Sequence, residues 1–198
     1  MIIFLNGCSS SGKTTIAKAI QHLSEEPWLL LGIDTFFQMM PSKYVGFGEK
    51  AVEGYHFISG QDEEGPLMGI ESGSFGNAVT DSIPKVVQSL AGDAHNLIVD
   101  EVLRTDKELG GYVRALASYK VYFIGVKCDV KEMQEREILR GDRALGLARN
   151  QTASVHGLSR AYYLMVDTTT KSAFVCAEEI LGFIKHNPNP TGFSFLAA

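Results

Sequence analysis

The sequence is poor in cysteine, in positive charge and in long apolar runs. Its three cysteines, Cys8, Cys128 and Cys176, are odd in number and widely spaced, which argues against a disulfide framework and against zinc-ligand spacing. The formal net charge of −5 provides no basic field, so nucleic acid is not expected as a partner. We therefore expect a cytoplasmic protein whose thiols are reduced.

No apolar stretch has the length of a membrane span or of a signal sequence. The run Ile2-Ile3-Phe4-Leu5 stops after four residues and has no charged segment before it, which is typical of a buried strand. We expect no membrane association. A chain of 198 residues can bury one good core but is short for two, so a single domain over residues 1–198 is predicted.

Short apolar runs alternate with amphipathic stretches along the chain. The runs are apolar almost without interruption, as expected for strands covered on both faces, and they lie at residues 2–6, 28–33, 96–99, 121–127 and 163–166. Helical periodicity follows at residues 13–23, 77–90, 107–118, 130–139 and 173–185. This alternation predicts a three-layer α/β/α fold with a parallel sheet of about five strands.

The strongest motif lies between the first predicted strand and the first predicted helix. The residues Gly7-Cys8-Ser9-Ser10-Ser11-Gly12-Lys13-Thr14 match the P-loop (Walker A) pattern G-x-x-x-x-G-K-[ST]. Glycines allow successive N–H groups to point at one anion, and the helix N-terminus adds its dipole. We expect Lys13 to reach the β- and γ-phosphates of ATP and the Thr14 hydroxyl to bind Mg²⁺, with Thr15 also beside the nucleotide.

Two interpretations of this motif are less favoured. A strand–turn–helix joint can match the pattern by chance, although the correct context argues against this here. Cys8 lies inside the loop, where it could act as a redox sensor, but we expect it to be a small packing side chain. The predicted fold is therefore that of the P-loop nucleotide kinases.

Acidic residues follow two other predicted strands, at the edge where parallel sheets bind ligands. Asp34 follows the second run, and Asp100 and Glu101 follow the third. Asp100 resembles a Walker B acid that holds Mg²⁺, although spacing does not choose between it and Glu101. Asp34 is predicted to be the general base that accepts a proton from the acceptor hydroxyl. The alternative for each aspartate is an N-cap of the following helix.

Arginine is absent before Arg104 and is then concentrated in residues 136–150, a segment that runs from a helix into a glycine-containing turn. We predict that this segment closes over ATP. Arg140 and Arg143 are expected to stabilise charge on the transferred phosphoryl group, and Arg136 is expected to contact the nucleotide. Ordinary arginines on a solvated helix face are the alternative.

Residues 41–76 are rich in glycine and acidic residues and show no long periodic pattern. Such a long irregular stretch is usually functional, so we interpret it as an insertion that covers the phosphoryl acceptor; a surface excursion without a role is the alternative. Residues 34–76 contain no arginine, which a nucleoside monophosphate kinase normally uses to hold a second phosphate. We therefore predict a neutral or cationic acceptor with an apolar body. Aromatic residues of this segment suit such a body: Phe36, Phe37, Tyr44, Phe47, Tyr55 and Phe57.

Several segments together resemble chloramphenicol phosphotransferase and its relatives among the small P-loop kinases. The matching segments are Leu5-Asn6-Gly7, Glu26-Pro27-Trp28-Leu29, Gly32-Ile33-Asp34, Met40-Pro41, Ile98-Val99-Asp100-Glu101-Val102, Gly125-Val126-Lys127-Cys128-Asp129, Arg140-Gly141-Asp142-Arg143 and Val166-Asp167-Thr168-Thr169. The resemblance implies an ATP-dependent phosphotransferase that modifies a primary hydroxyl, with Asp34 as its base and with Asp167 and Thr168 near the adenine. The chain departs from the family's antibiotic kinase at Cys8, where that kinase has glycine, and at Glu101, where it has aspartate.

The predicted function is transfer of the γ-phosphoryl group of ATP to a hydroxyl of a small molecule, either a chloramphenicol-like antibiotic or another metabolite. Two other functions remain open. In a nucleotide-dependent switch or ATPase the acceptor is water, although the Asn-Lys-x-Asp motif of GTP-binding switches is absent from the sequence. A nucleoside monophosphate kinase is disfavoured by the missing arginines.

Overall fold

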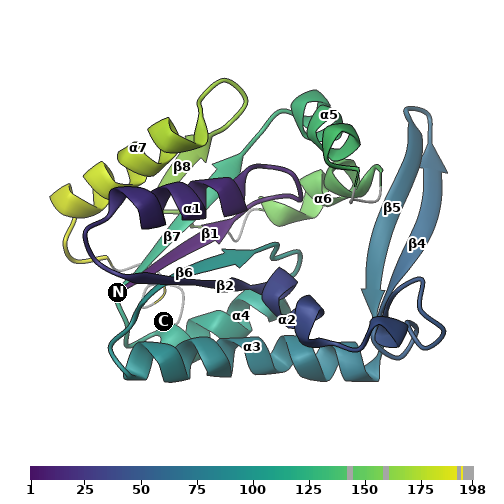
Figure 1. Cartoon of the computed structure of the whole chain (residues 1–198), viewed down its shortest axis with the longest axis horizontal. Coiled ribbons are helices and arrows are strands. Elements are labelled where there is room, and N and C mark those ends of the chain that lie inside the picture. Colours follow the sequence, from purple (N-terminus) through teal and green to yellow (C-terminus); the bar gives the residue numbers. More distant parts are fainter. Residues whose placement is uncertain (142–144, 158–160, 191–192, 194–198) are drawn as a thin grey trace.

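The computed structural model describes residues 1–141, 145–157, 161–190 and 193. Its main sheet has the strand order β2-β6-β1-β7-β8, and every adjacent pair is parallel (Figure 1). The strands are β1 Ile2–Asn6, β2 Trp28–Gly32, β6 Asn96–Glu101, β7 Val121–Lys127 and β8 Leu164–Asp167. The predicted sheet is confirmed, and all five carboxyl ends lie along one edge.

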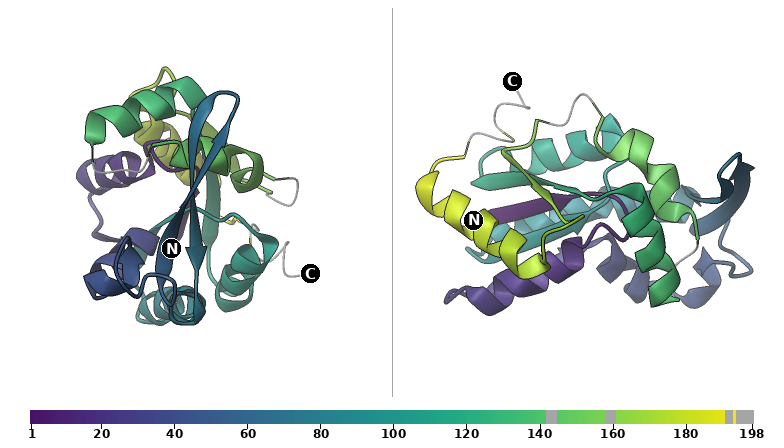
Figure 2. Two further views of the ribbon diagram at one scale, coloured as in Figure 1. Left: turned by 90° about the vertical axis from the view of Figure 1, so that its right-hand side faces the viewer. Right: turned by 90° about the horizontal axis from the view of Figure 1, so that it is seen from above.

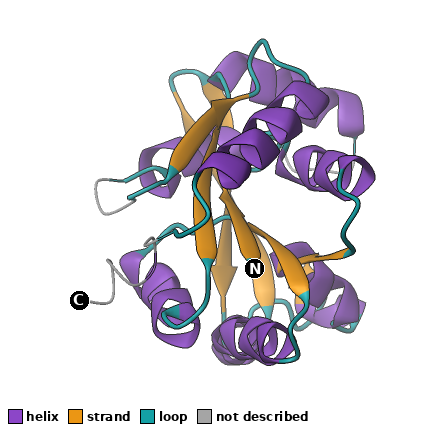
Figure 3. Cartoon of the chain, turned by 90° about the vertical axis from the view of Figure 1, so that its left-hand side faces the viewer, coloured by secondary structure: helices purple, strands orange, loops and turns teal. Residues whose placement is uncertain are grey.

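Helices cover both faces of this sheet (Figures 2 and 3). The helices over one face are α1 Lys13–Leu23 and α7 Ala173–His186, and those over the other are α3 Ser74–Gly92 and α4 Asp106–Leu116. Residues of β1 alternate between the two cores. Ile3 and Leu5 pack beneath α1 and α7, whereas Ile2 and Phe4 pack beneath α3 and α4. Because both faces are buried, both residue sets are apolar, which confirms the three-layer α/β/α arrangement.

The predicted helices are present, with ends set by local capping. Thr105 and Glu108 form a capping box at the start of α4, and the Ser172 hydroxyl accepts the Val175 N–H at the start of α7. Helix α3 begins at Ser74 rather than at the predicted residue 77, and it continues through Pro84. Helix α5 spans Val130–Arg140.

Residues 41–76 fold into a small second sheet beside the main one (Figure 1). Its elements are the 3₁₀ helix η1 Ser42–Tyr44 and the strands β3 Val45–Gly46, β4 Tyr55–Asp62 and β5 Gly65–Ser72. Strands β4 and β5 form an antiparallel hairpin whose last pair joins Asp62 to Gly65. Two short helices that the sequence did not predict, α2 Ile33–Met39 and α6 Leu147–Val155, lie close to the carboxyl edge of the main sheet.

Candidate functional site

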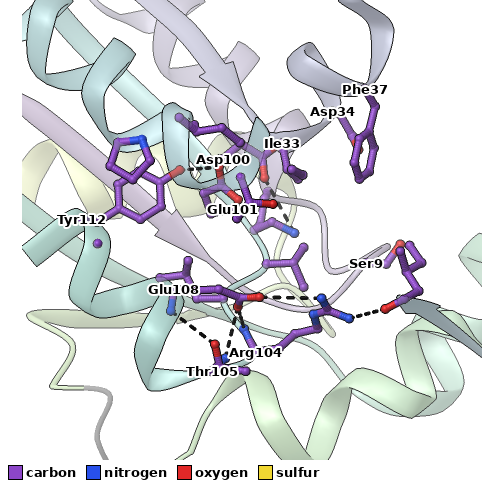
Figure 4. A pocket seen from close by; sticks show the side chains of 18 of the residues that line it. Ser9, Ile33, Asp34, Phe37, Asp100, Glu101, Arg104, Thr105, Glu108 and Tyr112 are labelled. Carbon is purple, nitrogen blue, oxygen red and sulfur yellow. Dashed lines mark hydrogen bonds and ion pairs between the residues drawn. The ribbon is translucent and has the colours of Figure 1, made fainter. Parts of the chain in front are cut away.

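A cavity of about 850 Å³ opens where β1, β2 and β6 end. Its lining combines the P-loop, the start of α2, the segment after β6, and one side each of α3 and α4 (Figure 4). Tyr55 and Ile70 of the hairpin and Arg140 at the end of α5 complete the wall. Predicted residues from distant parts of the chain therefore meet in one cavity, at the edge where parallel sheets bind ligands.

The P-loop has the geometry of an anion-binding loop. Gly12 has φ +93° and precedes α1, and Ser10 also has a positive φ of 58°. A side chain at Gly7 would bring its Cβ to 2.5 Å from the Val126 carbonyl oxygen, so glycine is required for the approach to β7. The buried hydroxyls of Ser10 and Ser11 have no hydrogen-bond partner among the described residues. A phosphate group fits this set of donors.

Lys13, Thr14 and Asp100 contact one another at the mouth of the loop. The Thr14 hydroxyl donates to Asp100 Oδ2 at 2.6 Å. Lys13 Nζ lies 3.7 Å from Asp100 Oδ1 and donates to the Cys8 carbonyl oxygen at 2.9 Å. The structure thus brings the predicted Walker A and Walker B residues together. A hydroxyl and a carboxylate are ligands suited to Mg²⁺, which completes its shell with phosphate oxygens and water.

The described residues contain no group of three or more His, Cys, Asp or Glu that could hold a metal ion. The contact between Thr14 and Asp100 is the one that would hold a magnesium ion together with a nucleotide, as is usual for this ion.

Glu101 has surroundings different from those of its neighbour Asp100. Its carboxylate is buried and accepts the Tyr112 hydroxyl at 2.6 Å. Burial raises the pKa of Glu101 to about 8, and the nearby charge of Asp100 adds to the effect although the hydrogen bond from Tyr112 opposes it. Of the two acids that the spacing left open, Asp100 is the one that contacts Lys13 and Thr14.

Asp34 lies in the first turn of α2, where it lines the cavity beside Phe37 (Figure 4). The helix N-cap is Gly32, and the helix after Asp100 is capped by Thr105, so the N-cap interpretation is wrong for both aspartates. A Cβ on Gly32 would lie 1.9 Å from the Asp100 carbonyl oxygen, and β2 therefore approaches β6 closely. This approach holds the two predicted acids at the same edge of the sheet.

Arg136 and Thr168 lie against the P-loop. Arg136 Nη2 donates to the Thr168 carbonyl oxygen at 2.8 Å, and the Thr168 hydroxyl donates to the Ser11 carbonyl oxygen at 2.7 Å. Asp167 ends β8 and accepts the Thr169 N–H at 2.9 Å, and hydrogen bonds from Thr169 lower the pKa of its carboxyl group. The residues predicted for the nucleotide side therefore join α5 and β8 to the phosphate loop.

Three further residues were predicted for the site: Arg140, Arg143 and Cys8. Arg140 is the last residue of α5 and lines the cavity. Arg143 lies outside the described residues. Cys8 is buried in a small apolar cluster with Cys128 and Met133, and burial raises the pKa of its thiol to about 11. A thiol with such a pKa stays protonated, in agreement with a packing role.

Comparison with known proteins agrees with this geometry. Residues 1–185 match a family model described as chloramphenicol phosphotransferase-like protein. The chain belongs to this family. Two relatives are proposed O-phosphotransferases from the CDC 1551 and H37Rv strains of Mycobacterium tuberculosis. Each is 29% identical over 196 residues, which cover 98% of this chain and 87% of the relative.

Solved structures of kinases share the fold of this family member. A sugar kinase from Janibacter matches with a TM-score of 0.64 at 16% sequence identity. The match covers 94% of this chain and 95% of the sugar kinase. An APS kinase from Mycobacterium tuberculosis matches with a TM-score of 0.61 at 12% sequence identity, over 93% of this chain and 96% of the APS kinase. The fold is that of the P-loop kinases. None of the helices in the described residues is long and apolar enough to span a membrane.

Helix α6 connects to the P-loop through contacts that the sequence did not predict. The Gln151 side-chain oxygen accepts the Ser9 N–H at 2.6 Å. The Glu137 carboxylate accepts the N–H groups of Gly146 and Ala148 at 3.0 and 2.7 Å, so a residue of α5 caps the start of α6. Because this cap comes from another helix, no local sequence pattern signals it.

Arg149 joins α6 to the tip of the β4–β5 hairpin. Its guanidinium donates to the Asp62 carboxylate at 2.7 Å and to Glu64 at 3.2 Å. It also donates to the carbonyl oxygens of Gly65 and Pro66 at 3.0 and 2.9 Å. The sequence placed Arg149 in the arginine-rich segment, but the structure shows its side chain on the hairpin rather than in the cavity.

The charges around the cavity differ from those that residues 34–76 alone indicated. Asp62 and Glu64 pair with Arg149 and do not line the cavity, so part of the acidic character of this segment is already neutralised. Cationic side chains from later elements line the cavity instead: Lys85, Arg104, Lys107 and Arg114. The lack of arginine in one segment therefore does not decide the charge of the acceptor, and a neutral or cationic acceptor stays a prediction.

Only some of the aromatic residues predicted for the acceptor region line the cavity. Phe37 and Tyr55 line the cavity, with ring centroids 4.5 Å apart. The Tyr55 hydroxyl donates to the Gly76 carbonyl oxygen at 2.7 Å, which fixes its ring at the base of the hairpin. Phe36 belongs to the core, and Phe47 is 80% exposed and packs on Phe57 outside the cavity.

Proposed function

We propose that this protein transfers the γ-phosphoryl group of ATP to a hydroxyl group of a small molecule. The observation that carries the proposal is the contact of Lys13, Thr14 and Asp100 in the same cavity that Asp34 lines. A phosphate-binding loop and a carboxylate suited to accept a proton are the two halves of a phosphoryl-transfer site. Use of ATP is further supported by the APS kinase of the same fold, which was solved with the nucleotide analogue AMPPNP.

Each side chain of the site has a separate role in the proposed phosphoryl transfer. The P-loop N–H groups and Lys13 hold the phosphates, and Arg136, Asp167 and Thr168 are placed on the nucleotide side. Thr14 and Asp100 hold Mg²⁺, which when bound neutralises phosphate charge. Asp34 orients the acceptor hydroxyl and accepts its proton. Arg140, with Arg143, stabilises the charge that spreads over the transferred group.

The cavity can accommodate more than the phosphates. Its volume and its apolar lining by Ile33, Phe37 and Ile83 suit a drug-sized acceptor with an apolar body. We propose a chloramphenicol-like antibiotic or a hydroxylated metabolite as this acceptor.

A phosphoryl-transfer screen tests the proposal. ATP and Mg²⁺ are incubated with the protein and a panel of hydroxylated metabolites and antibiotics that includes chloramphenicol, and products are detected by mass spectrometry. We expect at least one acceptor to gain a phosphoryl group and to increase ADP release. Rapid ATP hydrolysis that no acceptor changes would instead identify an ATPase.

A further inference from the structure

Helix α6 places one buried amide side chain against the P-loop. Gln151 is 7% exposed, and its Oε1 atom accepts the Ser9 N–H at 2.6 Å. Because only the oxygen of an amide accepts a hydrogen bond from an N–H group, this contact settles which end of the Gln151 amide is the oxygen. The other end, Nε2, carries two N–H donors.

The Nε2 group of Gln151 is open to the cavity. Gln151 is one of the residues that line the cavity. Its Nε2 group has no hydrogen-bond partner among the described residues, and it is not one of their fully enclosed polar atoms that lack a partner. The buried hydroxyl of Ser10, the residue after Ser9, is such an atom. Amide and hydroxyl donors without partners fit an oxyanion.

The peptide unit between Cys8 and Ser9 is held from two sides. Gln151 accepts its N–H, and Lys13 Nζ donates to its carbonyl oxygen at 2.9 Å. The lysine of a P-loop reaches the β- and γ-phosphates of the nucleotide. Since Gln151 and Lys13 contact the same peptide unit, Gln151 lies beside the reacting end of the nucleotide.

Contacts of α6 with its neighbours hold Gln151 in place before any ligand binds. Glu137 is buried, and its carboxylate accepts the N–H groups of Gly146 and Ala148 at the start of α6. Arg149 lies two residues before Gln151, so its side chain points to the opposite side of the helix, where it binds the hairpin. Donors that are fixed in advance need little reorganisation when charge develops next to them.

We propose that Gln151 binds the γ-phosphoryl group of ATP. Its amide oxygen keeps the Ser9 N–H, and its amide nitrogen donates to an oxygen of the γ-phosphoryl group. The side chain thereby replaces one N–H donor of the loop with two donors that reach farther into the cavity. Charge spreads over the phosphoryl oxygens during transfer, and these donors stabilise it together with Lys13. The inference rests on the proposed function, because it assigns Gln151 to the phosphoryl donor of that reaction.

Gln151→Glu separates this role from a structural one. The carboxylate still accepts the Ser9 N–H, but it offers no donor and repels a phosphate group. Gln88→Glu is the matched control, because Gln88 lines the same cavity from α3 and undergoes the same change of charge. Gln151→Met is a second variant, which keeps the length of the side chain and adds no charge. Where Gln151→Glu does not fold, Gln151→Met decides alone.

The measurement is the Kd of AMPPNP and of ADP, each with Mg²⁺, by isothermal titration calorimetry of the full-length protein. AMPPNP carries a γ-phosphoryl group and ADP does not. Gln151→Glu and Gln151→Met should each raise the Kd of AMPPNP at least about tenfold relative to the Kd of ADP. Gln88→Glu should leave the ratio of the two Kd values within about twofold of the wild-type ratio.

Three results would overturn the assignment. An unchanged ratio in the Gln151 variants would leave Gln151 as a support of the loop only. A changed ratio in Gln151→Glu but not in Gln151→Met would result from the added charge alone. An unchanged ratio together with a raised KM of the acceptor would place the amide on the acceptor.

A failure of the proposed function has a different outcome. AMPPNP binding that depends on Gln151, with no phosphoryl transfer to any acceptor, would overturn the proposed function and keep the γ-phosphate contact. Transfer by the wild-type protein with an unchanged ratio in the variants would overturn the assignment of Gln151 alone. No binding of AMPPNP to the wild-type protein would overturn both.

Discussion

Asp34 lies just after β2 and Asp100 lies near the end of the neighbouring strand β6, yet their side chains have different surroundings. Asp100 accepts the Thr14 hydroxyl and lies near Lys13, so its charge is engaged with the P-loop. Asp34 lies in the first turn of α2, on the wall where an acceptor would bind. A carboxylate near a metal or phosphate and a carboxylate near the acceptor hydroxyl perform different tasks.

Asp34→Asn tests the role of the general base. The amide keeps the shape of the side chain but cannot accept the hydroxyl proton, so phosphoryl transfer should fall by about 10²–10⁴ while the Kd for ATP stays within about twofold. Transfer rates and ATP titrations measure the two effects. Asp81→Asn is the matched control, because Asp81 lines the same cavity from α3. A wild-type kcat in Asp34→Asn would remove Asp34 from this role.

Glu101 predicts a pH dependence of stability. Its pKa is about 8 in the folded protein against an ordinary value of 4.5, so the folded state binds a proton more tightly than the unfolded chain. The resulting stabilisation is fully present below pH 4.5 and is lost as the pH rises toward 8. In Glu101→Gln the amide oxygen can still accept the Tyr112 hydroxyl but carries no titratable proton.

Denaturant unfolding without Mg²⁺ measures this effect. Between pH 5 and pH 8 the wild-type protein should lose a few kcal/mol of unfolding free energy relative to Glu101→Gln, on the order of 1.4 kcal/mol for each unit of pKa shift. Glu179→Gln, in a partly exposed ion pair with Lys171, should keep the wild-type slope. If Glu101→Gln and wild type gave parallel curves, the raised pKa of Glu101 would be wrong.

At the scale of elements, the hairpin depends on arginines from the second half of the chain. Arg104 donates to the Ile70 carbonyl oxygen on β5, and Arg149 holds the tip through Asp62 and Glu64. The acidic residues that suggested a cationic acceptor are thus partly structural. Helix α6, which carries Arg149, also carries Gln151 on the P-loop. It therefore links the hairpin to the P-loop.

Arg149→Ala should loosen the hairpin without unfolding the main sheet. We expect amide hydrogen exchange in β4 and β5 to become about tenfold faster, while β1 and β6 exchange as in the wild type. Mass spectrometry of deuterated peptides measures both. Lys171→Ala, which breaks the exposed ion pair with Glu179, is the control and should leave the hairpin unchanged. Unchanged exchange in β4 and β5 would show that Arg149 does not fix the hairpin.

The strands of the main sheet could be predicted from the sequence because both their faces are buried. In β1 every residue is buried, and its first four residues form an uninterrupted apolar run. The hairpin gave no such signal, since most of its residues are partly or fully exposed and Gly60, Pro66 and Gly69 interrupt its strands. Its two-residue turn, Glu63-Glu64, has none of the glycine or asparagine that usually marks a hairpin.

In the candidate site, too, the residues near the ends of buried strands could be predicted, and those that act through tertiary contacts could not. Lys13 begins the helix after β1, Asp34 lies just after β2 and Asp100 lies near the end of β6, so their position at the sheet edge could be inferred from chain order. Gln151 and Glu137 act through contacts between α5, α6 and the P-loop, which only tertiary packing creates. The choice between Asp100 and Glu101 also depended on side-chain direction, because the two are adjacent in β6.

At the scale of the whole molecule, the site draws on both halves of the chain. The arginine-free first half supplies the P-loop and Asp34, and the second half supplies Asp100 and the arginines. Arg136 reaches the loop through Thr168, whose hydroxyl donates to the Ser11 carbonyl oxygen. Nucleotide binding should therefore stabilise contacts that cross the entire fold, and it should be visible as global stability.

ATP with Mg²⁺ is expected to raise the melting temperature of the whole protein. A ligand at about 100 times its Kd adds about 2.7 kcal/mol, which for a chain of this size corresponds to about 5–10 °C. Lys13→Met should lose most of this shift, because Lys13 lies within the P-loop, is buried and faces Asp100. Lys18→Met, on the exposed side of the same helix, is the control and should keep it. An ATP shift as large in Lys13→Met as in the wild type would place the nucleotide elsewhere, and the cavity between the P-loop and Asp34 would then need another ligand.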